Sequence, residues 1–300
     1  MAVAEKRLEL REAHHYAASA KRATIGSRLN RLVLLVVLAG GAIVFMMPLY
    51  IMLAISLKTR VEAANTSPRS WPNQPTFDNF KQVWSDPGIN FLRAAVNTLI
   101  LAVFPTIGTV LSASIVAYPF ARLNFAGRDR LFVILLATMM LPGIVTLIPG
   151  YVLMAKLGWI DTFKPWIIGS CLGGGGFNIF LIRQFMLSIP REMDEAAKID
   201  GATNAIIFWR ILLPNCAPVL ATIAVFSFVA GFRDFMGPLM MLNSPEMQPL
   251  EVALKSLQGS HTTEYNLLMA GSMITTIPLI LIFIFCQRYF MKGITLTGGK

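Results

Sequence analysis

Six long stretches of the chain contain no charged residue and no histidine, and they dominate its pattern of hydrophobic and polar positions. They cover residues 32–57, 94–121, 131–155, 165–182, 211–232 and 265–287. A helix rises about 1.5 Å per residue, so about 20 residues cross a hydrocarbon layer of about 30 Å. Apolar runs of this length, without the alternation of a transmembrane barrel, favour helices. The pattern therefore predicts an all-α integral membrane protein with six transmembrane helices, which form one domain over residues 32–290.

Proline and glycine are concentrated in the third and fourth of these stretches. Pro142-Gly143 and Pro149-Gly150 predict a kink or an unwound turn in the third stretch. Four consecutive glycines at 173–176 lie within the fourth stretch, where such residues usually allow helices to pack closely.

The polar segment 58–93 contains a helical stripe of aromatic residues. Phe77, Phe80 and Trp84 recur at positions i, i+3 and i+7. The stripe fits a short helix that lies flat in the headgroup region of the membrane, and it fits equally a helix that packs on the ends of neighbouring spans.

Composition and charge agree with a membrane protein. Hydrophobic residues make up 55% of the chain and charged residues 14%, and the mean hydropathy is +0.61. The net charge of +10 would raise the question of nucleic-acid binding in a soluble protein. With the N-terminus in the cytoplasm, the inner side carries 17 lysines and arginines and the outer side eight, with Arg233 left over at a helix end. The positive-inside rule then accounts for the charge without nucleic acid, and it predicts cytoplasmic tails at 1–31 and 291–300.

The sequence contains no arrangement for catalysis, nucleotide binding or metal binding. The glycines at 173–176 and 298–299 do not belong to a G-x-x-x-x-G-K-[ST] motif. The three histidines, His14, His15 and His261, are scattered in polar segments, and no pair of carboxylates has a catalytic spacing. We therefore expect no enzyme activity, no cofactor and no metal ion in this chain.

The polar segment 188–218, between the fourth and fifth stretches, begins with the signals of a short helix. Ser188 and Pro190 are typical of a helix start, residues 191–200 are good helix formers, and Gly201 supplies the turn that ends such a helix.

A second short helix is predicted over residues 204–210. Ile206, Ile207 and Trp209 give it an apolar side. Its passage into the fifth span is marked by two prolines, Pro214 and Pro218. A compact, rigid protrusion of this kind suits a subunit that transmits force to a cytoplasmic partner.

The run EAAKIDGA at 195–202, followed by Leu213-Pro214 and Pro218, resembles the EAA loop of the membrane subunits of bacterial ATP-binding-cassette importers. The resemblance covers most of the chain from about Asn97 onward. Its segments are AYPFARLNFAGR at 117–128, LPGIVTLIPGYVLMAKLGW at 141–159, FLIRQFMLSIPREMDEAA at 180–197, LLMAGSM at 267–273 and QRYFMKGI at 287–294. The chain is most similar to carbohydrate-uptake permeases of the maltose type, and among them to the second, shorter permease subunit.

This resemblance implies a transport subunit, not an enzyme, within a larger assembly in the bacterial inner membrane. A second permease subunit would complete a heterodimer, and two ATPase subunits would bind ATP and Mg²⁺. A periplasmic or lipid-anchored solute-binding protein would deliver a sugar or oligosaccharide. Apart from membrane lipid, no further partner is implied, and no nucleic acid.

The resemblance also implies roles for single residues. Glu195 would pair with a basic residue of the ATPase, Ala196 and Ala197 would allow close approach, and Gly201 would set the bend of the loop. Two further residues of the matching segment are Asp200 and Pro214. The short tail that ends at Lys300 would also approach the ATPase pair.

The end of the fifth span departs from the family pattern. Around Asp234 the family more often has a tryptophan, an asparagine and a second tryptophan, whereas this chain has Phe232, Arg233 and Gly237. Arg233 and Asp234 are candidate residues of the substrate pathway, because an ionisable residue within a span usually marks a site. Arg233 fits a structural charge that reaches the outer interface, and it also fits an anionic sugar, such as a uronate-containing oligosaccharide or a sugar phosphate. A neutral and an acidic substrate therefore both stay open.

A stand-alone ion-coupled secondary transporter is the alternative function. Such transporters usually contain internal repeats and intramembrane carboxylates that bind the coupling ion. Here Asp234 is the only acidic residue near membrane depth. The sequence therefore favours the ATP-driven importer.

Overall fold

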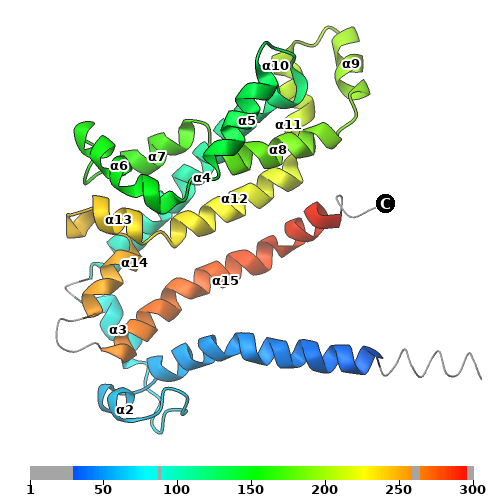
Figure 1. Ribbon diagram of the computed structural model, residues 1–300. Coiled ribbons are helices and arrows are strands. Elements are labelled where there is room, and N and C mark those ends of the chain that lie inside the picture. Colours follow the sequence, from blue (N-terminus) through cyan, green and yellow to red (C-terminus); the bar gives the residue numbers. More distant parts are fainter. Residues whose placement is uncertain (1–29, 87–88, 259–263, 296–300) are drawn as a thin grey trace, which may run out of the picture.

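Helices build almost the whole of the structure, a computed structural model that describes residues 30–86, 89–258 and 264–295. Within these ranges there is no β-strand, as predicted for an all-α chain. The larger elements are the helix Asn30–Ser56, α3 (Asp78–Ser85), α4 (Phe91–Arg122), α5 (Arg128–Thr138), α6 (Gly143–Lys156), α7 (Lys164–Cys171), α8 (Gly176–Ser188), α9 (Glu192–Ile199), α12 (Ala217–Phe232) and α15 (Tyr265–Thr295) (Figure 1). The short ones are α2 (Arg60–Asn65), α10 (Asn204–Ile206), the π-helix η1 (Ile207–Leu212), α11 (Leu213–Asn215), α13 (Met236–Met241), η2 (Pro245–Met247), α14 (Leu250–Ala253) and η3 (Leu254–Leu257).

α4 is the central helix of the molecule and packs along α12, α8 and α7. Its residues Ala113 and Ala117 are fully buried in a core that also contains side chains of α8 and α12. Gly231 of α12 lies so close to α4 that a Cβ atom on it would come within 2.7 Å of the carbonyl oxygen of Leu101. Small residues at the contacts therefore allow the helix backbones to approach closely, as is usual between helices in membranes.

Gly174 of the glycine patch 173–176 packs closely against α4, in line with the prediction. Gly174 has a φ of +66°, and a Cβ atom there would lie 2.5 Å from the carbonyl oxygen of Thr109 and 2.8 Å from the Cβ atom of Ala113. Both the left-handed backbone and the contact require glycine. The patch also separates α7 from α8 in the fourth stretch.

Over the described residues, the structure contains four segments that are long and apolar enough to cross a membrane. They are Asn30–Ser56, α4, Lys164–Ser188 and Tyr265–Phe285. α5 and α6 are bent against each other by 96°, and α12 is bent by 74° against the segment Asn204–Asn215. If each bent pair is one span, the described residues contain up to six spans, so the exact number of six stays a prediction. The kink at Pro142-Gly143 is thus confirmed, but it is so sharp that the third stretch is not one straight helix.

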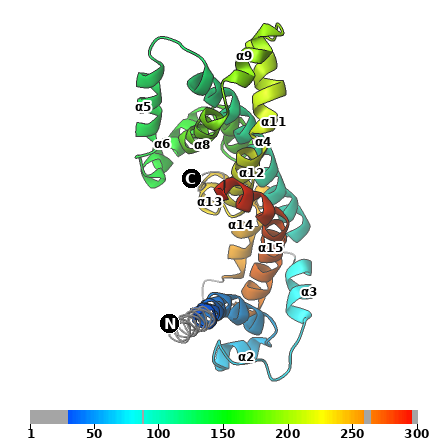
Figure 2. The ribbon, with the colours of Figure 1, turned by 90° about the vertical axis from the view of Figure 1, so that its right-hand side faces the viewer.

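The helix ends divide between two sides of the molecule. The start of Asn30–Ser56, α9 and the end of α15 lie at the right of Figure 1, whereas α2, α3 and α14 lie at the left. Figure 2 views the molecule from the side of α9. This arrangement places the start of Asn30–Ser56, the end of α15 and the segment 188–218 on the same side of the molecule (Figure 1). That this side is the cytoplasm stays a prediction, and the predicted tail 1–31 falls almost wholly outside the described residues.

The helix Asn30–Ser56 has few contacts with the rest of the described chain. Nearly all its side chains from residue 30 to residue 48 are exposed, including the large apolar ones of Leu34, Val37 and Phe45. Only its end near Ala54 is buried. The apolar surface of residues 30–48 is therefore left on all sides for lipid or for another subunit.

Hydrogen bonds of Lys58 and Asn79 fix the buried end of the helix Asn30–Ser56. Nζ of Lys58, which is fully buried, donates hydrogen bonds to Oγ1 of Thr66 at 2.8 Å, the carbonyl oxygen of Ser67 at 2.7 Å and Oγ of Ser70 at 2.9 Å. Nδ2 of Asn79 in α3 donates to the carbonyl oxygens of Ser56 and Lys58, both at 2.7 Å. The loop after the helix is thereby folded into a compact unit.

α3 packs on α15 and α4, and its residues Asn79 and Val83 are buried. These two residues are not part of the aromatic stripe, of which Phe80 is partly buried against the same core. Packing on the ends of neighbouring spans, one of the two interpretations of the stripe, is therefore supported only in part. Phe77 and Trp84 are exposed. Their insertion into the headgroup region stays a prediction.

Candidate functional site

The segment 188–218, called the EAA loop below, projects from one end of the molecule. α9 and α10 lie at the upper right of Figure 1, beyond the ends of α8 and α12. α9 covers Glu192–Ile199, nearly the whole of the predicted helix 191–200. Its three acidic residues lie in the first turn and Lys198 in the last, which suits the helix dipole.

Gly201 ends α9 in the way that the sequence predicts. Its φ is +82°, its amide donates to the carbonyl oxygen of Lys198 at 3.0 Å, and the amide of Ala202 donates to that of Ala197 at 2.9 Å. This pair of bonds is the Schellman motif, in which a left-handed residue reverses the chain and satisfies the last carbonyl groups of the helix. The direction in which α9 points therefore depends on Gly201.

The matched residues of the EAA loop divide between two faces. Glu195, Ala196 and Asp200 are exposed, and Glu195 forms no ion pair with the described part of the chain. Ala197 is buried against this chain's own core. Of the two alanines that were expected to allow close approach of a partner, only Ala196 is therefore accessible to one.

The second helix of the EAA loop differs from its prediction. A π-helix, Ile207–Leu212, follows one short turn of α-helix, and Ile207, Phe208 and Leu212 are buried. Ile206 and Trp209, predicted on the apolar side, are 40% and 49% exposed. The prediction assumed the α-helical period, whereas the wider π-turn changes which residues share a face. Pro214 lies in α11, just before the bend into α12, as expected.

Apolar side chains are exposed on the EAA loop. Ile199 is 87% exposed, and Met193, Ile206 and Trp209 are exposed to a lesser degree. Large exposed apolar side chains next to polar ones are typical of a surface that binds another protein.

An ion pair that the sequence analysis missed lies beneath α9. Arg122, the last residue of α4, pairs with Asp194 of α9. Both residues stand in segments that carry the family resemblance, AYPFARLNFAGR and FLIRQFMLSIPREMDEAA, but nothing in their spacing reveals that they meet.

The second candidate group, Arg233 and Asp234, lies at the end of α12. Oδ2 of Asp234 accepts a hydrogen bond from Nε1 of Trp166 in α7 at 3.0 Å, and Oδ1 accepts one from the amide of Gly237 at 3.2 Å. A Cβ atom on Gly237 would come within 2.7 Å of Oδ2 of Asp234. The missing side chain at this position thus makes room for the carboxylate, and Trp166, which the sequence analysis did not single out, joins the group.

Of the three departures from the family pattern, Arg233 alone is exposed, whereas Phe232 is buried and stacks on Phe228. No carboxylate in the described ranges lies within ion-pair distance of Arg233. The charge of Arg233 nevertheless acts electrostatically on the half-buried Glu251 of α14. Burial raises the pKa of Glu251, and the charge of Arg233 partly opposes this rise. Arg233 is thus an exposed cation without an ion-pair partner in the described ranges, and it can pair with an anionic ligand group.

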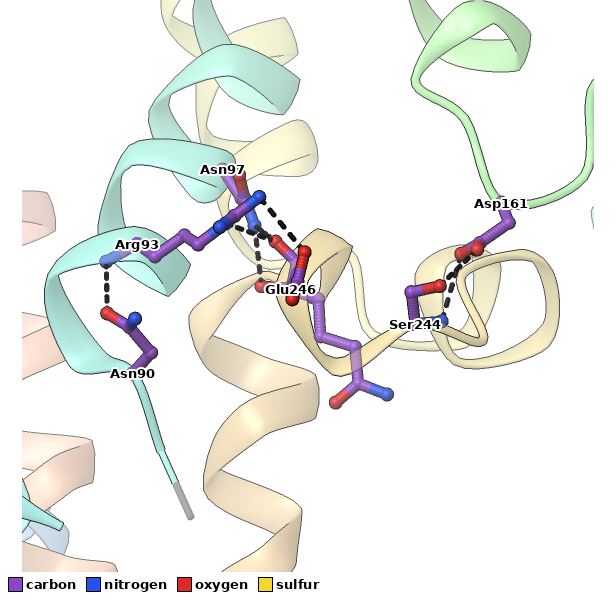
Figure 3. A network of polar contacts seen from close by, with 7 residues as sticks. Asn90, Arg93, Asn97, Asp161, Ser244 and Glu246 are labelled. Atoms are coloured by element: carbon purple, nitrogen blue, oxygen red, sulfur yellow. Dashed lines mark hydrogen bonds and ion pairs between the residues drawn. The ribbon is translucent and has the colours of Figure 1, made fainter. Parts of the chain in front are cut away.

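A polar network holds the loop between α13 and α14 (Figure 3). Nε of Arg93 and Nδ2 of Asn97, both in α4, donate to the carbonyl oxygen of Glu246 at 3.0 and 2.9 Å. The carboxylate of Asp161 accepts hydrogen bonds from the amides of Asn243 and Ser244 and from Oγ of Ser244. The bonds from Ser244 hold the pKa of Asp161 below its usual range. The loop is therefore fixed to α4 on one side and to the turn before α7 on the other.

No cluster of three or more potential metal ligands occurs among the residues of known placement. The two groups thus offer a protein-docking surface and a polar site beside a span. Neither offers the nucleophile, base or metal that catalysis would require.

The family model for the inner membrane component of binding-protein-dependent transport systems matches residues 110–296. The chain belongs to this family, whose members are membrane permease subunits and not enzymes. It is 31% identical over 265 residues to the arabinooligosaccharides transport system permease protein AraQ of Bacillus subtilis (strain 168), a match that covers 86% of this chain and 92% of AraQ. It is 33% identical over 233 residues to the galactooligosaccharides transport system permease protein GanQ of the same strain, with 76% and 82% covered.

A solved structure has the same fold. It is a chain of a bacterial ABC transporter involved in the import of the acidic polysaccharide alginate, with a TM-score of 0.76 and 24% identity over 88% of this chain and 97% of that one. These matches confirm the resemblance to importer permeases, and they favour the ATP-driven importer over the ion-coupled transporter.

Proposed function

We propose that this chain is one of two permease subunits of an ATP-driven importer of oligosaccharides in the bacterial inner membrane, with both termini and the EAA loop in the cytoplasm. The observation that carries the proposal is the EAA loop itself. Its first helix is closed by Gly201, is fixed to the body on one face and exposes Glu195 and Ala196 on the other. A helix built in this way fits the cleft of a separate ATPase subunit.

The ATPases supply the energy in this mechanism. Two ATPase subunits bind ATP and Mg²⁺ and close upon each other, drawing the EAA loops of the two permeases together and turning the pathway outward. Hydrolysis restores the inward-facing state. A periplasmic or lipid-anchored solute-binding protein delivers the substrate, and this chain itself binds no cofactor.

The second permease subunit completes the pathway. The apolar surface of residues 30–48, which the described part of this chain leaves uncovered, supports such a partner. The tail near Lys300, which lies outside the described residues, is proposed to approach the ATPases.

The substrate class is an oligosaccharide, since AraQ and GanQ are named for arabino- and galactooligosaccharides. Arg233 lies in the pathway in this proposal, while Asp234 positions Trp166 and the start of α13. The exposed guanidinium of Arg233 fits an acidic sugar, and the importer with the same fold takes up an acidic polysaccharide. An acidic oligosaccharide is therefore the preferred substrate.

Glu195→Gln tests the coupling role. Loss of a charge-assisted contact across an interface costs about 1.5–3 kcal/mol, so we expect uptake by the full complex to fall about ten-fold or more. Because Glu195 is exposed, the amount of inserted subunit should not change. Uptake and ATP hydrolysis in proteoliposomes measure the effect, with the exposed Glu192→Gln on the same helix as control. Normal uptake and normal substrate-stimulated hydrolysis in the Glu195 variant would contradict the assignment.

Arg233→Gln tests the substrate class. We expect the KM for an acidic oligosaccharide to rise about ten-fold, because a charge-assisted hydrogen bond is lost, while uptake of a neutral oligosaccharide stays the same. Arg233→Lys, which keeps the charge, should retain most of the uptake. If the Gln variant transports the acidic substrate as well as the wild type does, Arg233 is a structural charge near Glu251.

A further inference from the structure

Arg122 and Asp194 form a buried ion pair where the EAA loop meets α4. Nε of Arg122 lies 3.0 Å from Oδ2 of Asp194, and the two side chains are only 4% and 11% exposed. Nη2 of Arg122 also donates a hydrogen bond to the carbonyl oxygen of Ile189 at 2.9 Å. A single guanidinium therefore holds both α9 and the segment that leads into it.

The charge of Asp194 is balanced chiefly by Arg122. The Nε–H bond of Arg122 is not directed at the carboxylate, and Oδ1 of Asp194 has no hydrogen-bond partner within the ranges that the structure describes. The contact is thus electrostatic. Removal of either side chain would leave the other charge buried and uncompensated, whereas removal of both would not. The pair also lies at two helix ends of favourable sign, the C-terminus of α4 and the first turn of α9.

α9 is attached to the body through one face only. Its buried residues are Asp194 and Ala197, three positions apart, and Ala197 belongs to the same apolar core as Tyr118 of α4 and Phe208 of η1. The rings of Tyr118 and Phe208 lie 5.2 Å apart. The inner face of α9 therefore packs on η1 and is linked to the end of α4 through Asp194, and the outer face, with Glu195, is left for a partner.

α4 is also the helix that contacts most of the membrane domain. It packs along α12, α8 and α7, so its displacement must move those helices as well. We propose that the Arg122–Asp194 pair makes α9 and α4 move as one rigid unit, and that this pair carries the displacement of the EAA loop into the membrane. Both are positioning residues, because they touch neither substrate nor nucleotide. This inference rests on the proposed function and adds the route by which force leaves the loop.

The test compares alanine variants in the full complex, reconstituted in proteoliposomes with its ATPases and binding protein. The single variants Arg122→Ala and Asp194→Ala should lower the amount of assembled complex, because each leaves a buried charge unpaired. The double variant should assemble like the wild type but transport about ten-fold less substrate per ATP hydrolysed, since the link itself is gone. Glu192→Ala removes an exposed carboxylate from the same turn of α9 and should leave the ratio unchanged.

Arg122→Lys gives a milder second measurement. It keeps the charge, but an ammonium group lacks the planar guanidinium fork that reaches Asp194 and Ile189 together. We therefore expect normal assembly, and an amount of substrate transported per ATP hydrolysed that lies between those of the wild type and the double variant. A double variant that assembles and keeps the wild-type ratio of uptake to hydrolysis would overturn the inference. Wild-type complex without ATP-dependent uptake would instead contradict the proposed function itself.

Discussion

Gly201→Ala is expected to uncouple the importer, with substrate uptake falling about ten-fold while ATP hydrolysis continues. Gly201 has a φ of +82°, and a non-glycine residue in the left-handed region costs about 1–2 kcal/mol. No atom lies within 4 Å of the place that a Cβ atom would take, so the variant is strained but not overpacked. The strain is relieved by changing the turn after α9, and this redirects the helix relative to the ATPase cleft. The subunit should therefore insert normally and fail in coupling.

Gly127→Ala is the matched control for this prediction. Gly127 has a φ of +81°, lies just before α5 and also has open space at its Cβ position. The Gly127→Ala variant has the same backbone strain at a turn outside the EAA loop. Substrate uptake per ATP hydrolysed by the complex with this variant should therefore stay near that of the wild type. Gly201→Asn offers a second check, because asparagine tolerates the left-handed conformation better than alanine and should recover part of the uptake. Equal ratios for the Gly127 and Gly201 alanine variants would show that the turn after α9 has no special role in coupling.

Gly174→Ala should destabilise the membrane domain by about 2–4 kcal/mol, since backbone strain and overpacking add. The new Cβ atom would lie 2.5 Å from the carbonyl oxygen of Thr109, and a backbone atom of α4 cannot move aside as a flexible side chain would. The contact between the break after α7 and the central helix would have to open. Thermal unfolding of the detergent-solubilised complex and the amount of inserted subunit measure this effect.

Two nearby glycines separate the effect of backbone strain from the effect of overpacking. Gly175 has a φ of +86°, but the nearest atom to its Cβ position is 3.8 Å away, so Gly175→Ala tests strain without overpacking. Gly169 lies in α7 with open space and an ordinary φ, and Gly169→Ala should be nearly neutral. We expect Gly174→Ala to be the most destabilising of the three. Equal losses for Gly174 and Gly175 would mean that the close approach to α4 contributes nothing.

Much of this protein could be derived from local patterns. The apolar runs predicted the spans because a membrane requires about 20 apolar residues from each crossing helix, whatever its neighbours are. α9 and its end at Gly201 were predicted almost to the residue, since capping and left-handed turns depend on a few adjacent positions. The break at Pro142-Gly143 was predicted for the same reason, although its angle of 96° was not.

Interactions between residues far apart in the chain could not be predicted from local sequence patterns. Trp166 donates to Asp234 from a helix 68 positions earlier in the chain, and no spacing rule connects them. The apolar side predicted for the second helix of the EAA loop is divided, with Ile207 buried and Trp209 exposed, because the α-helical period was applied to a segment that is a π-helix. Ala197 was expected at the partner surface, but it is buried in this chain's own core.

The sequence by itself determined the membrane class of the protein, its helical spans and the two-helix form of the EAA loop. Each of these follows from hydrophobicity, charge and backbone preference within a short segment. Only the tertiary structure decided which face of α9 is fixed to α4, that Arg122 compensates the charge of Asp194, and that Gly237 leaves room for Asp234 to hold Trp166. These contacts depend on how whole helices pack, and packing is set by the summed shape of residues that are far apart in the chain.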